Sequence, residues 1–180
     1  MKGTRFALAA MVLGTALGAS QAKAQLSCGG TTNCNLTNTA SVTIPNLVSL
    51  SMGSATTALT APTAAQVEAG TPIDNPGPTF TVKANRAWTL NINSARAAFW
   101  DFNAVAGTAK PISDLGWSLT SGSGYAAITS GLSPVSSGAA TNGGTPLPVY
   151  FRTNYSTDFT AASNAPGIYS LPIVFTLSAP

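Results

Sequence analysis

Histidine is absent from the 180-residue sequence, and charged residues make up only 7% of it. Without histidine, the most common general base and a frequent metal ligand are missing. The few acidic residues are scattered singly, and the sequence has neither a nucleophile elbow nor a Ser-x-x-Lys motif. We therefore expect a protein that is not an enzyme, with no metal site and no cofactor.

Long hydrophobic runs are scarce as well. One apolar run, Phe6–Ala19, follows Lys2 and Arg5 and precedes the small-x-small site Ala22-Lys23-Ala24. This is the pattern of a Sec-type signal peptide over residues 1–24, cleaved after Ala24. The run falls short of the roughly 20 residues that a membrane-spanning helix needs, although a retained anchor is the alternative. We expect a chain without a membrane span that is secreted, at the cell surface or in the periplasm.

Charge of either sign is balanced once the predicted leader is removed. Five basic residues then face five acidic residues: Lys83, Arg86, Arg96, Lys110 and Arg152 against Glu68, Asp74, Asp101, Asp114 and Asp158. A neutral chain has no electrostatic footprint for nucleic acid or anionic lipid. We expect no nucleic-acid partner.

Only two cysteines are present, Cys28 and Cys34. In an oxidising compartment, two cysteines joined by so short a loop predict one disulfide. Lipidation of Cys28 is the alternative, because Leu26-Ser27-Cys28 partly resembles a lipoprotein processing site. We expect an N-terminal segment over residues 25–38 and a single domain over residues 39–180.

The most regular pattern in the chain runs from Phe80 to Ile92. Every even position except Arg86 is apolar, which is the period of a strand with one buried face. A two-residue hairpin turn would split this apolar set across both faces. The pattern therefore predicts one long bent strand, or two strands joined through a bulge or an odd-length turn.

Elements of the first half surround this stretch. Residues 39–52 predict two short strands broken at Pro45-Asn46. Residues 62–70 predict one or two helical turns, with a Thr63–Gln66 capping box and Gly70 as C-terminal cap. Residues 74–78 predict a turn.

The second half alternates between irregular chain and strands. We expect residues 93–110 to be irregular, residues 112–120 to hold a strand, and residues 121–148 to be surface loop with a strand near 126–129. A strand ends near Thr153, and a final strand places Tyr169 to Leu177 on one face. Pro172 in that strand implies a sheet edge or a bulge.

These short strands with turn-rich connections and almost no helix predict an all-β protein. We expect an antiparallel immunoglobulin-like β-sandwich with one short helix in a long loop, and a closed barrel is the alternative.

Two Trp-x-Leu tripeptides, Trp88-Thr89-Leu90 and Trp117-Ser118-Leu119, precede a terminal Gly167-Ile168-Tyr169 and Phe175-Thr176-Leu177-Ser178-Ala179-Pro180. This layout resembles the WxL domain of bacterial surface proteins over most of residues 39–180. The resemblance implies a β-sandwich that attaches non-covalently to the cell wall, commonly within larger surface complexes. The chain departs from the family in carrying Phe175 where the terminal motif has Trp.

The motif residues Trp88, Leu90, Trp117, Leu119, Tyr169 and Phe175 lie on the apolar parity of their strands, so we expect them in the core. A ligand surface is expected, if anywhere, at Trp100, Asp101, Phe102 and Asn103, where Trp100 could stack on a sugar ring. The alternative there is an aromatic cluster that caps one end of the domain.

These features support an exported, non-catalytic structural or attachment protein of the cell surface or envelope. Its partner would be an envelope polymer or other surface proteins. Two alternatives remain. One is a fimbria-like subunit that assembles by strand donation, with residues 35–52 as the donor strand. The other is a glycan-binding module that uses Trp100.

Overall fold

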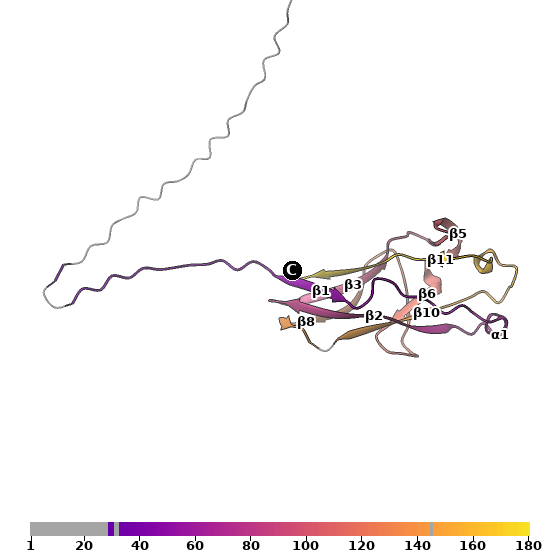
Figure 1. Cartoon of the computed structure of the whole chain (residues 1–180), viewed down its shortest axis with the longest axis horizontal. Helices are drawn as coiled ribbons and strands as arrows, with labels where there is room; N and C mark the ends of the chain where they lie inside the picture. Colours follow the sequence, from indigo (N-terminus) through magenta and orange to yellow (C-terminus); the bar gives the residue numbers. More distant parts are fainter. Residues whose placement is uncertain (1–28, 31–32, 145) are drawn as a thin grey trace, which may run out of the picture. The chain divides into compact units, whose positions relative to one another are not determined.

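A computed structural model describes residues 29–30, 33–144 and 146–180 (Figure 1). The predicted signal peptide and Cys28 lie outside these residues, so the leader and the Cys28–Cys34 disulfide stay predictions. The chain divides into two units, residues 1–43 and residues 44–180. In the first unit, residues 33–43 are exposed and form neither helix nor strand.

The second unit is mostly β, with antiparallel sheets and little helix, as the sequence predicts. Its first half contains β1 (Val48–Met52), α1 (Ala64–Glu68), β2 (Ile73–Ala84), β3 (Trp88–Ser94), β4 (Phe99–Phe102) and β5 (Val105–Pro111). Its second half contains the 3-10 turn η1 (Ile112–Asp114), β6 (Leu115–Ser118), β7 (Ala126–Ala127), β8 (Ser133–Gly138), β9 (Thr141–Asn142), β10 (Leu147–Thr153), the 3-10 turn η2 (Ala162–Asn164), β11 (Tyr169–Ser170) and β12 (Ile173–Ser178).

The strands form three antiparallel sheets. The first sheet has the order β1-β2-β10-β6-β7, with β9 also pairing with β2. The second sheet has the order β12-β3-β8, and the third has the order β11-β4-β5. In Figure 1 the yellow C-terminal strand lies alongside β1 and β3, while α1 lies at the opposite end of the domain.

The stretch from Phe80 to Ile92 forms two strands joined by three residues, Asn85–Ala87. β2 and β3 belong to different sheets and do not pair with each other. All the apolar even positions in this stretch are buried: Phe80, Val82, Ala84, Trp88, Leu90 and Ile92. The prediction of two strands with an odd-length connection is confirmed, because such a connection lets both strands face one core.

That core lies where the first and second sheets meet. The rings of Phe80 on β2 and Phe175 on β12 have centroids 4.3 Å apart. Phe151 of β10 and Trp117 of β6 join the same cluster from the first sheet, and Trp88 joins it from the second. Burial of these large apolar side chains is the main stabilising contribution to the domain.

The short helix forms as predicted. The Thr63 hydroxyl accepts a hydrogen bond from the Gln66 amide, and the Gln66 side chain accepts one from the Thr63 amide. Gly70 follows the helix with φ of +62°, the left-handed conformation that favours glycine at a helix end. Val67 is the buried residue of the helix, and it holds this turn against the domain.

Two expectations for the first half are wrong. Only Val48–Met52 forms a strand, and the predicted earlier strand over residues 39–44 does not form. Residues 74–78 are part of β2 instead of a turn. Pro76 and Pro78 are tolerated there because β1 pairs only with Phe80–Ala84, which leaves the start of β2 without a ladder on that edge.

Two expectations for the second half are also wrong. Residues 93–110 contain a hairpin, β4–β5, whose register shifts between Phe99 and Asp101 and whose two-residue turn places Asn103 and Ala104 at φ of +49° and +65°. Residues 121–148 are not simply a surface loop, because β8 pairs with β3 and places Val135 in the core. Both segments lack the aliphatic alternation that predicts strands.

The final strand, which the sequence predicts as one element, is divided in two. Leu171 and Pro172 separate β11 from β12, and β12 pairs only with β3 among the described strands. The predicted edge position is therefore confirmed. Along β12 the odd residues face the core and the even residues face outward.

Candidate functional site

The Trp-x-Leu residues lie inside the domain. Trp88 and Leu90 are buried on β3, and Trp117 is buried on β6. Leu119, just past β6, is partly buried against the same core. Tyr169 and Phe175 are also partly buried there. Trp88, Leu90 and Trp117 are covered by the core, whereas Tyr169 and Phe175 keep part of their surface exposed.

Trp100 is only 3% exposed, so little of its ring is available to stack on a sugar. Its indole Nε1 donates to the carbonyl oxygen of Pro111 at 2.9 Å, which holds the ring inward. Asp101 is buried and forms an ion pair with Arg96 at 2.7 Å. Phe102 packs on Tyr169, with ring centroids 5.0 Å apart.

Asn103 closes the β4–β5 turn onto the C-terminal segment. Its main-chain amide donates to the carbonyl oxygen of Ile168 at 2.8 Å, and its side-chain Oδ1 accepts from the main-chain amide of Ile168 at 3.0 Å. The four residues 100–103 therefore do come together, but as the end-capping cluster that was the alternative interpretation.

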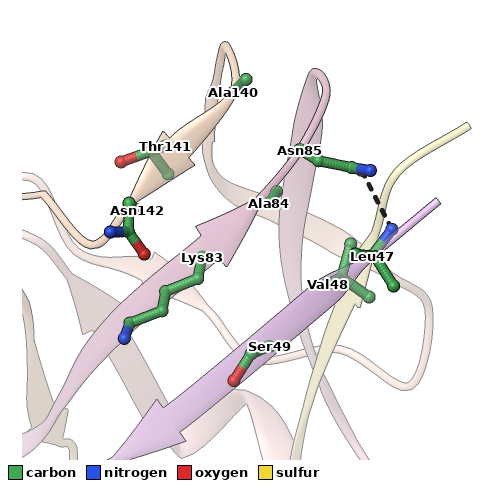
Figure 2. A pocket seen from close by; sticks show the side chains of 9 residues that line it. All are labelled: Leu47, Val48, Ser49, Lys83, Ala84, Asn85, Ala140, Thr141 and Asn142. Carbon is green, nitrogen blue, oxygen red and sulfur yellow. Dashed lines mark hydrogen bonds between the residues drawn. The ribbon is translucent and has the colours of Figure 1, made fainter. Parts of the chain in front are cut away.

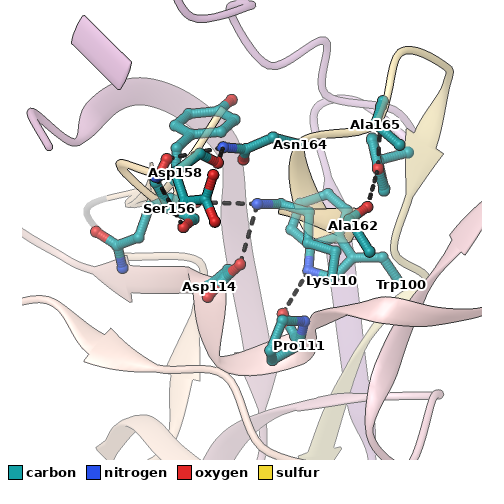
Figure 3. Close-up of polar contacts among 12 residues, drawn as sticks. Trp100, Lys110, Pro111, Asp114, Ser156, Asp158, Ala162, Asn164 and Ala165 are labelled. Carbon is teal, nitrogen blue, oxygen red and sulfur yellow. Dashed lines mark hydrogen bonds and ion pairs between the residues drawn. The ribbon is translucent and has the colours of Figure 1, made fainter. Parts of the chain in front are cut away.

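Beside Trp100 lies a buried cation that the sequence does not reveal (Figure 3). Lys110 is 3% exposed, and its Nζ donates to Asp114 Oδ2 at 3.1 Å and to the Asn154 carbonyl oxygen at 2.9 Å. The same Nζ lies 4.6 Å from the Tyr155 ring centroid and 5.7 Å from the Trp100 ring centroid. A buried ammonium with this many partners is fully compensated, so the cluster is structural.

A cavity of about 340 Å³ adjoins this cluster between the 59–67 segment and the 163–169 segment. Burial raises the pKa of Tyr155, which lines it. Thr153 Oγ1, also in the lining, has no hydrogen-bond partner among the described residues. The lining is mostly uncharged, and it includes Lys110, whose ammonium group is paired with Asp114.

Apolar side chains are left partly uncovered between β1 and β12, along what we call the seam. Val48, Leu50 and Met52 pair with Ala84, Val82 and Phe80, so they share the core-facing side of the first sheet. Yet Val48 is 47% and Met52 is 45% exposed. Residues that point toward the core are therefore left half uncovered at this edge.

The two strands form the lips of the seam, and the apolar side chains of the β12 lip are also incompletely buried. Ile173, Phe175 and Leu177 of β12 face the core, and all three are only partly buried. At one end the lips approach each other, where Asn46 Nδ2 lies 3.5 Å from the Ala179 carbonyl oxygen. The seam thus runs between two sheet edges with apolar side chains on both sides.

At its other end the seam opens into a cavity of about 570 Å³. The walls come from both sheets and from the loop after β1, and they include Met52, Leu59, Leu115, Phe151, Ile173 and Phe175. Charged residues are absent from the full lining. An apolar groove along an unpaired strand is suited to bind an extended peptide.

The hydrogen bonds around β12 show which backbone groups are free. The Ala95 amide donates to the Pro172 carbonyl oxygen, and the register of β12 on β3 continues without a shift to Ser178. In an antiparallel ladder such bonding positions alternate. The amides and carbonyls of Ile173, Phe175 and Leu177 therefore point away from β3, toward the seam.

The segment before β1, residues 36–44, which we call the arm, has apolar side chains that are exposed. Its even positions include Leu36, Ala40, Val42 and Ile44, and all are exposed. Val42 is 84% and Ile44 is 70% exposed. The arm has the period of a strand but forms no strand among the described residues.

Asn85 holds the chain where the arm meets the domain (Figure 2). The Asn85 side-chain Oδ1 accepts a hydrogen bond from the main-chain amide of Leu47 at 2.9 Å. The main-chain amide of Asn85 donates to the Leu47 carbonyl oxygen at 3.1 Å. Its Nδ2 donates to the Pro45 carbonyl oxygen at 2.9 Å. Asn85 also lines a shallow pocket, together with Lys83 and Thr141 among others.

The sequence predicted a strand within the arm, where none forms among the described residues, and it did not predict the seam. The signal in the arm was its alternation of apolar and polar residues. The seam arises from the spacing of two strands 120 residues apart in the chain, and one sequence alone carries no record of that contact.

No cluster of three or more potential metal-ligating side chains occurs in the described part of the chain. Among the helices of that part, none is long and apolar enough to cross a membrane.

No family model matches the sequence, and no curated protein matches it either.

Proposed function

We propose that this protein is an exported, non-catalytic structural subunit of the cell surface or envelope that works by non-covalent assembly. In this proposal the domain is an immunoglobulin-like β-sandwich similar to the WxL domain. Its partners are envelope polymers or other surface proteins.

The observation that carries the proposal is the exposed aliphatic face of the arm. Full burial of a Val or Ile side chain stabilises by about 1.5–3 kcal/mol relative to leaving it exposed. Val42 and Ile44 are largely exposed and lie at strand period. A segment with strand period whose aliphatic side chains are exposed in the described part of the chain favours a partner outside it.

The half-covered seam supports the same proposal from the domain side. Two sheet edges with core-facing residues exposed are a template for pairing with another chain. The predicted leader, the predicted disulfide and the neutral Ser, Thr, Asn and Gly-rich composition agree with a protein that works outside the cytoplasm.

Cell fractionation tests this proposal. Full-length protein, expressed from its own sequence in a bacterial host, is followed with an antiserum through cytosolic, envelope and medium fractions. We expect sedimentation with the envelope or with large surface assemblies, and cytosolic retention of a variant that lacks residues 2–24. Recovery of the exported protein wholly as a small soluble species would contradict the proposal.

A binding assay with purified cell wall and purified outer membrane separates the possible envelope partners. A wall-attached protein co-sediments with peptidoglycan sacculi, as the WxL resemblance implies. A protein that is held in place by its own kind or by other surface proteins stays in the supernatant of that assay while remaining in the envelope fraction of cells.

A further inference from the structure

We propose that the seam of one copy binds the arm of a second copy, residues 36–44, as an added strand alongside β12. This inference rests on the proposed function, because it names the partner through which the subunit assembles. It commits to a second copy of this chain as the occupant.

The arm carries apolar side chains that could cover the partly exposed residues of the seam. In an extended conformation its aliphatic side chains lie on one face together with Asn38, and only Thr and Ser side chains lie on the other. Placed along β12, the aliphatic face covers the half-exposed residues of both lips, and the polar face stays in water. Pro45 follows directly and ends the pairing, because it has no amide hydrogen to donate.

The backbone of β12 offers the matching hydrogen bonds. Ile173, Phe175 and Leu177 direct their amides and carbonyls toward the seam, and no described backbone hydrogen bond reaches them. Strand addition satisfies such groups directly. At about 3.3 Å per residue, the nine residues of the arm span about 30 Å, enough to cover the six residues of β12.

The other edge of the second sheet is a poorer acceptor. β8 contains Pro134 and Gly138, and its register against β3 shifts between Leu90 and Asn91. Proline and irregular pairing are devices that protect sheet edges from added strands. β12 is regular, rich in aliphatic and aromatic residues, and free of both devices.

The connection between arm and domain favours a second copy over the chain's own arm. To reach its own seam, the arm would have to reverse direction between Ile44 and Leu47. Asn85 holds both Pro45 and Leu47 in place over that stretch. The segment 39–47 contains no glycine to ease a reversal.

Neither surface carries charge. Residues 33–47 contain no Lys, Arg, Asp or Glu, and the cavity lining contains none. Association therefore depends on apolar burial and backbone pairing, and it varies little with ionic strength. Because arm and seam are different surfaces, the contact is heterologous and produces an open series of subunits, or a closed dimer if two arms exchange.

The first experiment measures the mass of the exported full chain by light scattering over a range of concentrations. We expect dimers or a series of higher species that persist at high salt. The double variant Val42→Asp, Ile44→Asp should be monomeric. Its matched control, Ser41→Asp with Thr43→Asp, adds the same charge to the outward face and should still assemble.

The second experiment locates the contact. Two separately purified full-length variants, Thr43→Cys and Thr176→Cys, are mixed and treated with a flexible bismaleimide. A cross-linked pair that contains one of each is expected. The control mixture combines Thr43→Cys with Ser137→Cys, which lies on the far edge of the same sheet. It should give no more of the cross-linked pair than a mixture without bismaleimide.

The outcomes separate this inference from the proposed function. A monomeric wild-type chain, or equal assembly by both double variants, overturns the inference. If such a chain still sediments with the envelope, the proposed function survives with another partner. If assembly and cross-linking occur but the protein is not in the envelope or on the surface, the inference stands and the proposed location is wrong.

Discussion

Phe80 and Phe175 pack with their ring planes at 44° and so join the first sheet to the second. Phe80 comes from the middle of β2 and is fully buried. Phe175 comes from the edge strand β12 and also lines the open cavity beside the seam. The same contact therefore links the best-covered and the least-covered parts of the core.

Replacing Phe80 with alanine should lower the free energy of unfolding by about 3–5 kcal/mol, because a buried ring is lost and a cavity remains. Phe175→Ala should lower it by less, since that ring is already partly exposed. Urea unfolding of the purified chain measures both. Val174→Ala, an outward-facing neighbour, is the control and should change little, and equal losses for the two Phe variants would contradict this description of the core.

The Lys110–Asp114 pair predicts an asymmetric response to mutation. Lys110 is almost wholly buried, whereas Asp114 is 25% exposed in its side chain. Asp114→Asn leaves a buried ammonium without its counter-ion and should cost about 3 kcal/mol, at the low end for broken buried pairs. Lys110→Met leaves a carboxylate that water can reach, so it should cost less.

Urea unfolding of the two single variants and of the double variant measures this difference. The double variant should be no less stable than Asp114→Asn alone, because it removes both charges together. A larger loss for Lys110→Met than for Asp114→Asn would show that the lysine is held by the rings and the Asn154 carbonyl, and not by the carboxylate.

The Asp74–Arg152 pair predicts a weak acid dependence of stability. Hydrogen bonds from the Arg152 guanidinium hold the pKa of Asp74 below its usual value of 3.8. A carboxyl whose pKa is lower in the folded state contributes stability above pH 4, and this contribution is lost as the pH falls through the folded pKa. Both side chains are partly exposed, so the contribution is about 0–1 kcal/mol.

Carbon-13 NMR of the carboxyl groups tests this directly. Arg152→Gln should raise the pKa of Asp74 toward 3.8. The pKa of Asp158, which is lowered by hydrogen bonds from Thr160, serves as the internal control and should not move. An unchanged Asp74 titration in the variant would show that the ion pair does not persist in solution.

The β4–β5 turn predicts a stabilising substitution. Ala104 has φ of +65°, a conformation that costs a residue with a side chain about 1–2 kcal/mol relative to glycine. Ala104→Gly should therefore raise the free energy of unfolding by about 0.5–1 kcal/mol after the added entropy of glycine in the unfolded chain. Ala106→Gly, in the following strand, should lower it, and equal effects of the two changes would contradict the turn geometry.

The alternation of apolar and polar residues predicted the strands in which one face is buried. The even parity from Phe80 to Ile92 held across a change of sheet, because a three-residue connection preserves the inward face. The edge position of β12 was also predictable, since Pro172 has no amide hydrogen to donate to a second neighbouring strand.

The missed elements lacked such local signals. The Asn103–Ala104 turn has no glycine, and its hairpin is made of strands with mixed polarity. β8 is rich in Ser, Pro and Gly, and it is a strand because β3 pairs with it and Val135 reaches the core. Here tertiary pairing overrides local preference.

The candidate site was predictable on one side only. The alternation at Val42 and Ile44 indicates a strand, but neither residue is in a strand and both are largely exposed. Trp100 was chosen because it lies in irregular sequence, yet its hydrogen bond to Pro111 and its burial make it part of the end cluster. Burial of an isolated aromatic residue depends on distant segments, which the local pattern does not report.

The three hydrogen bonds of Asn85 give the domain a defined point at which force enters. A pull on the arm passes through Pro45 and Leu47 into β1, which is paired along its whole length with β2. Tension along that strand loads its ladder bonds together in shear, instead of peeling them apart one after another. A surface subunit connected through its arm would thus resist extension where the chain enters its first sheet.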